Sequence, residues 1–151
     1  EELGYYGSKS SGDEYVRTPM NCDGGAWADE QLGGKVISAL KDVSYSVAGQ
    51  EDDSASVLKV YEQFSKVRNT YPALSEGTMT VCSFSESAIA AWYMTDSAGN
   101  RMLVVHNLSN SARSIAVSDD MSKPVAVLGS GSVSSGRLSL SANSSVVFKL
   151  Y

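Results

Sequence analysis

The sequence is poor in the residues that build metal and redox sites, with one histidine and two cysteines. The single histidine, His106, excludes a multi-histidine metal site and leaves one candidate base for serine–histidine chemistry. The spacing of Cys22 and Cys82 specifies neither a zinc site nor a disulfide framework. We therefore expect no metal and no cofactor.

Long apolar runs and an excess of basic residues are also missing. No apolar stretch approaches the ~20 residues that cross a bilayer, so we expect no membrane partner. Lysine and arginine number 12 against 17 aspartate and glutamate, and the net charge of −5 opposes binding to a phosphate backbone. We therefore expect no nucleic-acid partner. The 42% hydrophobic and 19% charged residues that are present are typical of a globular chain.

The first third of the chain has no sustained periodicity. Residues 1–52 contain eight glycines and many small polar residues, with short apolar patches such as residues 36–40. This composition predicts a long loop that contains a short helix. Because compact domains seldom carry so long a loop unless it is functional or rests on another body, we expect this one to lean on a neighbouring domain.

A helix is predicted over residues 54–70. Asp53 or Ser54 is expected to cap it, because their side chains can accept a hydrogen bond from a free amide of the first turn. Pro72 lacks an amide donor and disfavours helix in the residue before it, so the helix should end near Thr70. Apolar residues at the i, i+3, i+4, i+7 spacing form one face, namely Val57, Leu58, Tyr61, Phe64, Val67 and Tyr71.

Beyond Gly77 the period changes to two. Segments rich in β-branched and aromatic residues recur at intervals of about ten residues, which is typical of an antiparallel sandwich. The Ser/Gly-rich stretch 129–136 is interpreted as a wide turn. The predicted strands are 78–84, 88–95, 101–108, 113–117, 125–128, 137–140 and 145–151.

Three motifs, in order along the chain, carry a resemblance to a known family. Glu-Glu-Leu-Gly at 1–4, followed by Asp-Glu-x-x-Arg-Thr-Pro-Met at 13–20, is similar to the segment that leaves barrel strand eight in alpha-amylase-type glycoside hydrolases (glycoside hydrolase family 13). Residues 54–61 and 67–74 resemble that family's last barrel helix and its exit. Val-Val-His-Asn-Leu-Ser at 104–109 resembles a mid-strand motif of its C-terminal domain.

The resemblance implies an α+β fragment that looks like the back end of something larger. Residues 1–76 would be the loop-and-helix end of a (β/α)8 barrel, and residues 77–151 would form a Greek-key β-sandwich of about seven strands. The family's catalytic carboxylates lie on barrel strands upstream of these segments. We therefore expect the chain to contain no catalytic residue and to have a structural role.

The same resemblance implies partners and a location. The expected partner is the catalytic barrel of the same enzyme, through which α-glucan would be bound, and the family favours an extracellular or cell-surface location. A chain without that barrel would leave the apolar helix face in water, which costs ~1.5–3 kcal/mol per large side chain. Alone, the chain is expected to self-associate or to loosen its N-terminal half.

Arg17 is the one residue to which the resemblance gives a role in substrate binding, because an arginine in this loop of the family can lie near the acceptor side of the sugar cleft. Loops at the C-terminal end of barrel strands build the active sites of that fold. The alternative is structural, with Arg17 pairing to Asp13 or Asp23 and pinning the loop.

A hydrolase complete in itself would need two carboxyl groups ~5–5.5 Å apart, one of them with a raised pKa. Adjacent carboxylates in an extended chain point to opposite sides, and the three pairs here lie in polar surroundings that do not raise a pKa. We interpret them as solvated loop charge: Glu1-Glu2, Asp13-Glu14 and Asp119-Asp120.

Aromatic residues support an alternative function, a carbohydrate-binding module that stacks on α-glucan. Trp92 and Tyr93 are adjacent in a predicted strand, so they face opposite ways and one of them can be exposed. The Tyr5-Tyr6 pair is a second candidate platform. His106, flanked by valines in a predicted strand, is interpreted as a surface or satisfied core residue. The glycosylation sequons at Asn107 and Asn143 are of a kind common by chance.

Overall fold

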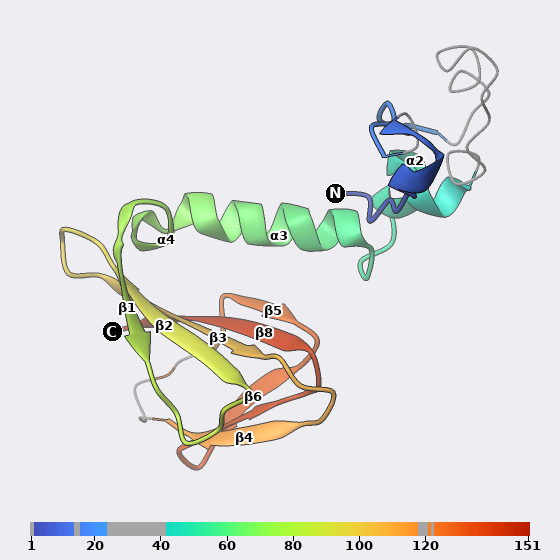
Figure 1. Ribbon diagram of the computed structural model, residues 1–151. Coiled ribbons are helices and arrows are strands. Elements are labelled where there is room, and N and C mark those ends of the chain that lie inside the picture. The colour runs from blue at the N-terminus through green and yellow to red at the C-terminus, as the bar shows by residue number, and fades with distance from the viewer. Residues whose placement is uncertain (1, 14–15, 24–41, 118–120, 122) are drawn as a thin grey trace. The chain divides into compact units, whose positions relative to one another are not determined.

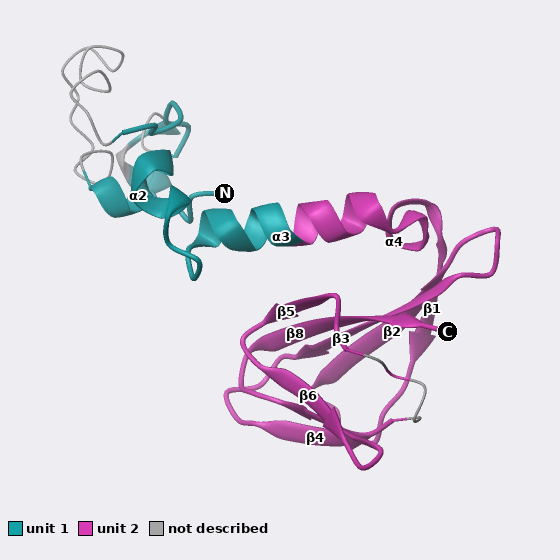
Figure 2. Ribbon diagram, turned by 180° about the vertical axis from the view of Figure 1, so that it is seen from behind, with its two compact units in different colours: residues 1–63 teal, residues 64–151 magenta. Residues whose placement is uncertain are grey.

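A computed structural model describes residues 2–13, 16–23, 42–117, 121 and 123–151. The chain divides into two compact units, Glu1–Gln63 and Phe64–Tyr151 (Figure 2). Among the described residues, none of the helices combines the length and the apolar character that a bilayer crossing requires.

The first unit is built from short elements. A 3-10 turn, η1 (Lys9–Ser11), lies near the start of the unit, and another, η4 (Val43–Tyr45), leads into helix α2 (Val47–Glu51). Ser46 caps α2, because its Oγ accepts a hydrogen bond from the Gly49 amide at 3.0 Å. Helix α2 is a short helix within residues 1–52, as predicted, whereas the apolar patch at residues 36–40 falls outside the described part of the chain.

Helix α3 spans Val57–Thr70 and begins later than predicted. The expected cap at Asp53 or Ser54 is wrong. Ser56 caps the helix instead, with its Oγ accepting a hydrogen bond from the Lys59 amide at 3.2 Å. Asp53, Ser54 and Ser56 are all of residue types that cap helices well. Ser56 is held in place because its Oγ donates a hydrogen bond to the Gln50 carbonyl oxygen at 2.9 Å.

The predicted end of α3 at Thr70 is confirmed. Pro72 then opens a separate short helix, α4 (Pro72–Glu76), which the sequence reasoning missed. Proline suits the first helical turn because its missing amide donor would have no partner there.

A five-stranded antiparallel sheet forms the larger layer of the second unit (Figure 1). Its strand order is β1-β2-β3-β8-β5, so the last strand in the sequence lies inside the sheet, paired with β3 on one side and β5 on the other. The strands are β1 (Thr78–Cys82), β2 (Ile89–Thr95), β3 (Arg101–Asn107), β5 (Ala126–Leu128) and β8 (Ser144–Leu150).

The second layer is a three-stranded antiparallel sheet of order β4-β7-β6. Its strands are β4 (Arg113–Ala116), β6 (Gly131–Ser134) and β7 (Arg137–Leu140). The interpretation of 129–136 as a wide turn is therefore wrong. Ser135 and Gly136 have φ of 49° and 69°, and two central residues with positive φ make the tight turn that joins β6 to β7.

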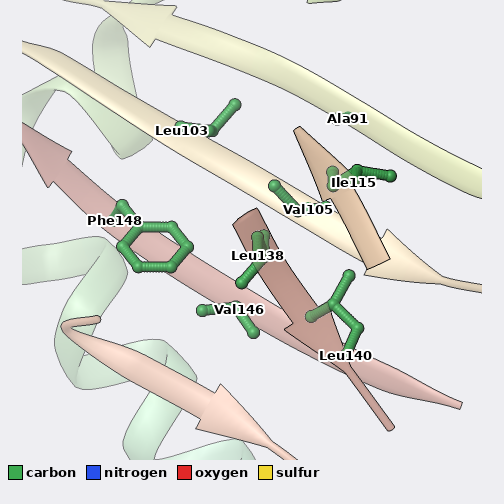
Figure 3. Close-up of a cluster of buried hydrophobic side chains, with 8 residues drawn as sticks. All are labelled: Ala91, Leu103, Val105, Ile115, Leu138, Leu140, Val146 and Phe148. Atoms are coloured by element: carbon green, nitrogen blue, oxygen red, sulfur yellow. The ribbon is translucent and has the colours of Figure 1, made fainter. Parts of the chain in front are cut away.

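The described residues form eight strands in two antiparallel sheets and few helices, so the predicted α+β fold class is confirmed. The inward faces of both sheets meet in one hydrophobic core, because alternate residues of a strand point to one side. Figure 3 shows these side chains converging between the strands. The core consists of Ala91, Leu103, Val105, Ile115, Leu138, Leu140, Val146 and Phe148.

The opposite, outer face of the five-stranded sheet packs against helix. Apolar residues at and beyond the C-terminal half of α3 lie on sheet residues of β3, β5 and β8, and α4 contacts β2 and β3. The apolar face predicted for the helix is thus covered only in part, since Val57 and Tyr61 near its start are exposed. The packed helix-side residues are Phe64, Val67, Tyr71 and Leu74, and those of the sheet include Met102, Val104, Ala126 and Val147.

Candidate functional site

The loop that carries Arg17 is the candidate site that the sequence points to. The Val16 and Arg17 amides both donate hydrogen bonds to the Asp13 carbonyl oxygen, at 3.1 and 2.9 Å. Arg17 Nη1 lies 3.9 Å from Asp13 Oδ2, and the Arg17 side chain is 79% exposed. An exposed ion pair of this length contributes little stability, so the backbone bonds hold the loop. Of the two readings of Arg17, the pairing with Asp13 is present.

A cavity of about 290 Å³ lies beside this loop, within the first unit. Arg17 does not line it, although its neighbours in the chain do. The walls mix aromatic, hydroxyl, amide and carboxyl groups, a composition that suits a polar ligand. They include Glu2, Tyr5, Thr18, Pro19, Asn21 and Tyr45.

Helix α2 anchors the far end of the loop. The Val47 and Ala48 amides, in the first turn of α2, donate to the carbonyl oxygens of Asn21 and Cys22, each at 2.9 Å. These amides have no partner within the helix, so the loop satisfies them. A buried glutamine of the same helix, Gln50, binds the Leu3 carbonyl and so fixes the opposite wall. Sequence reasoning missed Gln50, since a glutamine in a polar stretch carries no signal of burial.

Two tyrosines meet at the cavity wall. The rings of Tyr5 and Tyr45 pack edge to face, with centroids 6.3 Å apart. Burial raises the pKa of the Tyr5 phenol, so Tyr5 is neutral and can donate or accept a hydrogen bond at physiological pH. Tyr6, the other member of the predicted aromatic pair, is exposed. The Tyr5-Tyr6 pair is therefore not a joint stacking platform.

Glu2 and Asp13 are the members of the predicted carboxylate pairs that lie within the described residues. Hydrogen bonding from backbone lowers the pKa of Glu2, the direction opposite to that of a general acid. Asp13 lies on the surface between Lys9 and Arg17. The other carboxylates of these pairs lie outside the described residues, namely Glu1, Glu14, Asp119 and Asp120.

Within the described ranges no group of three or more histidine, cysteine or acidic side chains could hold a metal ion. Both cysteines are free thiols, and burial raises the pKa of Cys82.

His106 sits on the outer face of the five-stranded sheet, in β3. Its Nδ1 lies 2.6 Å from Ser145 Oγ, and its ring stacks at a tilt on Trp92 with centroids 5.1 Å apart. Burial lowers the pKa of His106. These contacts engage Nδ1 and one face of the imidazole ring.

Trp92 and Tyr93 do face opposite ways. Tyr93 packs against the inner core, with the Arg101 guanidinium 4.3 Å from its ring centroid. Trp92 lies on the outer face and packs against the cluster beneath α3 and α4. Both are half-buried, so neither is a fully open aromatic platform.

The two sequons differ in exposure, since Asn107 is buried and Asn143 is exposed. Asn107 is fully buried, and its Nδ2 donates to the carbonyl oxygens of Ser111 and Ser141 at 2.9 and 2.7 Å. Asn143 Nδ2 donates to Asn110 Oδ1 at 3.3 Å.

Comparison with known proteins shows which family this chain resembles. Residues 89–147 match the family model of the alpha-amylase SusG C-terminal domain. Over 164 aligned residues the chain is 39% identical to alpha-amylase SusG of Bacteroides thetaiotaomicron, an alignment that covers 99% of this chain and 23% of the relative.

Solved structures share the fold. A mutant of the trehalulose synthase MutB in complex with Tris superposes with a TM-score of 0.72 and 25% identity, covering 91% of this chain and 26% of that one. Amy13B of Eubacterium rectale superposes with a TM-score of 0.63 and 24% identity over 70% of this chain and 22% of that one. The chain spans about a quarter of the length of the proteins it matches.

Proposed function

The chain belongs to the alpha-amylase-type glycoside hydrolases, of which it is a C-terminal part, and we propose that it is a non-catalytic module that stabilises the barrel of a longer enzyme. That enzyme hydrolyses the α-glucosidic bonds of starch or maltooligosaccharides, as the name of the alpha-amylase relative suggests. The partners of the module are then the catalytic barrel and, through the barrel, α-glucan.

One observation carries this proposal. Helix α3 is uninterrupted from Val57 to Thr70, yet its first half belongs to the first unit and its second half to the second. The second half packs through Phe64 and Val67 on the outer face of the five-stranded sheet. A helix that both units share joins the sandwich directly to the segment before it, which supports a structural role.

The proposed division of the chain is residues 1–76 for the end of the barrel and 77–151 for the sandwich. Gly77 stands at this point, between α4 and β1, and a Cβ there would collide with the Ala73 carbonyl oxygen. The chain can therefore turn sharply from helix into strand at Gly77. The location proposed for the whole enzyme is extracellular or on the cell surface, by family resemblance.

The first test is turnover. The 151-residue chain is incubated with a chromogenic maltoside. We expect no product above the buffer rate, because retaining hydrolysis needs a carboxyl group with a raised pKa and the pKa of Glu2 is lowered. Sustained turnover that survives repeated purification would overturn the non-catalytic assignment.

The second test is stabilisation. A chimera carries this chain in place of the matched 164 residues of the Bacteroides thetaiotaomicron alpha-amylase. We expect one cooperative thermal transition for the chimera, at a higher temperature than for the relative with that region deleted. Separate, unshifted transitions would contradict the proposal.

Arg17 is proposed to contact substrate on the acceptor side of the cleft. Its exposed guanidinium and its position beside the tyrosine-lined cavity support this role. In the chimera, Arg17→Ala should raise KM for maltoheptaose, while Arg68→Ala, which removes an exposed arginine at the end of α3, should not. Equal KM values for the two variants would assign Arg17 to loop pairing alone.

A second candidate function is α-glucan binding by the sandwich itself. It is favoured by the planar, neutral imidazole of His106 next to the Trp92 indole, because aromatic faces flanked by polar groups stack on sugars. The half-burial of Trp92 weighs against it. Titration of the chain with maltoheptaose, followed by tryptophan fluorescence, should show a saturable shift for a binder and a flat trace for a structural module.

A further inference from the structure

The segment that carries Arg17 has both of its ends tied to one helix, α2. At the first end, Gln50 Nε2 donates a hydrogen bond to the Leu3 carbonyl oxygen at 2.8 Å. At the second end, two amides in the first turn of α2 donate to the carbonyl oxygens of Asn21 and Cys22, each at 2.9 Å. We call the chain between these ends the Arg17 segment. Its base is α2, so the position of Arg17 depends on how α2 holds that base.

The tie at the first end is made by a buried side chain that reaches three places. A glutamine amide has two N–H donors and an oxygen acceptor, and Gln50 uses all of them. Besides the bond to Leu3, its Nε2 donates to the Ser44 carbonyl oxygen at 2.7 Å, and its Oε1 accepts from the Leu58 amide at 3.0 Å. Ser44 lies in the turn before α2, and Leu58 lies in the first turn of α3. Gln50 therefore fixes the start of the Arg17 segment relative to both helices.

The same bonds hold the walls of the 290 Å³ cavity. Leu3 and Asn21 line it, and their carbonyl oxygens are among those that α2 binds. Tyr45 lines it too, directly after Ser44, whose carbonyl oxygen Gln50 also binds. Loss of the Gln50 amide would release two of these walls at once, because a buried carbonyl left without its partner favours a shift toward another donor.

We propose that Gln50 is a positioning residue for substrate binding on the acceptor side of the cleft. The inference rests on the proposed function, in which Arg17 contacts substrate there. The bonds that Arg17 makes to Asp13 stay within the Arg17 segment, so they move with it and do not fix it to the rest of the unit. A displacement of about 1 Å is enough to weaken a contact with substrate. Gln50 acts by holding the base of the segment and does not itself touch substrate.

The test uses the chimera with the Bacteroides thetaiotaomicron alpha-amylase and three variants. Gln50→Leu removes all three bonds of the side chain, and Gln50→Met does so with an unbranched chain that fits the same space more easily. Ser56→Ala is the matched control. Ser56 is buried in the same unit and bonds to the backbone carbonyl of Gln50, so its loss destabilises the unit and leaves the Gln50 side chain intact.

Two substrates separate positioning from stability. Maltoheptaose fills both sides of the cleft, whereas α-maltosyl fluoride loses a fluoride ion and places no sugar on the acceptor side. Gln50→Leu and Gln50→Met should raise KM for maltoheptaose by roughly 3–10-fold, the range that follows from the loss of one hydrogen bond, and should leave KM for the fluoride unchanged. Ser56→Ala should change neither KM value.

A merely structural role of Gln50 gives a different result. Loss of folded enzyme lowers kcat for both substrates together and leaves both KM values as they were. Equal fold-changes in KM for maltoheptaose and for the fluoride, or equal KM values for the Gln50 variants and Ser56→Ala, would therefore overturn the positioning role.

A double-mutant cycle tests whether Gln50 acts through Arg17. Residues that act together give non-additive effects, whereas the effects of independent residues add. We expect Gln50→Leu to raise KM for maltoheptaose in the chimera but to add little when Arg17→Ala is already present. Additive increases would contradict the positioning of Arg17 by Gln50.

The cycle also separates this inference from the proposed role of Arg17. If Arg17→Ala leaves KM for maltoheptaose unchanged, the proposed substrate contact fails and the inference fails with it. If Arg17→Ala raises KM and neither Gln50 variant does, the substrate contact stands and Gln50 has a purely structural role.

Discussion

Gln50 Nε2 donates a hydrogen bond to the carbonyl oxygen of Leu3, 47 residues earlier in the chain, at 2.8 Å. The same nitrogen donates to the Ser44 carbonyl at 2.7 Å, and Gln50 Oε1 accepts from the Leu58 amide at 3.0 Å. Gln50 is 6% exposed. One buried side chain therefore joins the N-terminal segment, the turn before α2 and the first turn of α3.

Gln50→Leu should destabilise the first unit selectively. It keeps a similar volume but leaves two carbonyls and one amide without their partners, each at a cost of about 1–3 kcal/mol when buried. Hydrogen exchange followed by mass spectrometry should show faster exchange in residues 2–13 and 42–63, with the sandwich unchanged. Gln63→Leu, at an exposed position of α3, is the control. Equal exchange in both variants would mean that water replaces the lost bonds.

Asn107→Asp should destabilise the sandwich. The Asn107 amide donates to two carbonyl oxygens, and its Oδ1 accepts from the Ser109 amide at 3.1 Å. A carboxylate would replace this buried donor by a charged acceptor that faces two carbonyl oxygens, a loss of about 2–4 kcal/mol. Urea denaturation measures this loss, with Gln63→Glu as an exposed amide-to-acid control. A midpoint within error of that control would contradict the role assigned to Asn107.

Phe148→Ala should remove much of the stability of the second unit. Phe148 is fully buried and comes from β8, which pairs on both sides. Loss of such a ring costs about 3–5 kcal/mol through lost burial and the cavity left behind. Lys149→Ala, at the next residue and on the outer face, should cost far less in the same denaturation experiment. Similar losses for the two would show that β8 contributes through its backbone rather than through the core.

His106 should make the stability of the sandwich fall on mild acidification. Burial lowers its pKa in the folded state, whereas in the unfolded chain it titrates near the usual value of about 6.5. The unfolded state therefore binds the proton first. The contribution of His106 to the free energy of unfolding is complete above about pH 6.5. It declines as the pH falls below this value and levels off below the pKa of His106 in the folded state.

His106→Gln removes this linkage. Its unfolding midpoint in urea should change less than that of the parent between about pH 7 and pH 5. Parallel pH profiles for the parent and the variant would show that other groups set the acid sensitivity.

Periodicity explains which elements could be predicted. The apolar spacing of α3 and the apolar runs of β2, β3 and β8 are strong signals because these elements are buried, β3 and β8 on both faces. All four elements were found close to their predicted bounds. β6 has one apolar residue, Val133, and therefore no alternation to detect. Its place comes from the tight turn at 135–136 and from pairing with β7, neither of which leaves a hydrophobic pattern.

The candidate site was less accessible to sequence reasoning. Arg17 and its loop were found through the family motif, but the cavity beside them depends on Gln50, Tyr45 and the first turn of α2, which lie in a stretch without periodicity. Hydrogen bonds between residues far apart in the chain decide that geometry. Such long-range hydrogen bonds cannot be predicted from the composition or the spacing of residues.

The position of β8 has a consequence for biosynthesis. The strand that completes the interior of the larger sheet emerges from the ribosome after its neighbours β3 and β5. Until then β3 has one side of its backbone unpaired, and the edge strand β5 lacks its neighbour in the sheet. During that interval they are open to partners other than the correct one. Nascent chains of this domain should therefore depend on holding chaperones until the final strand arrives.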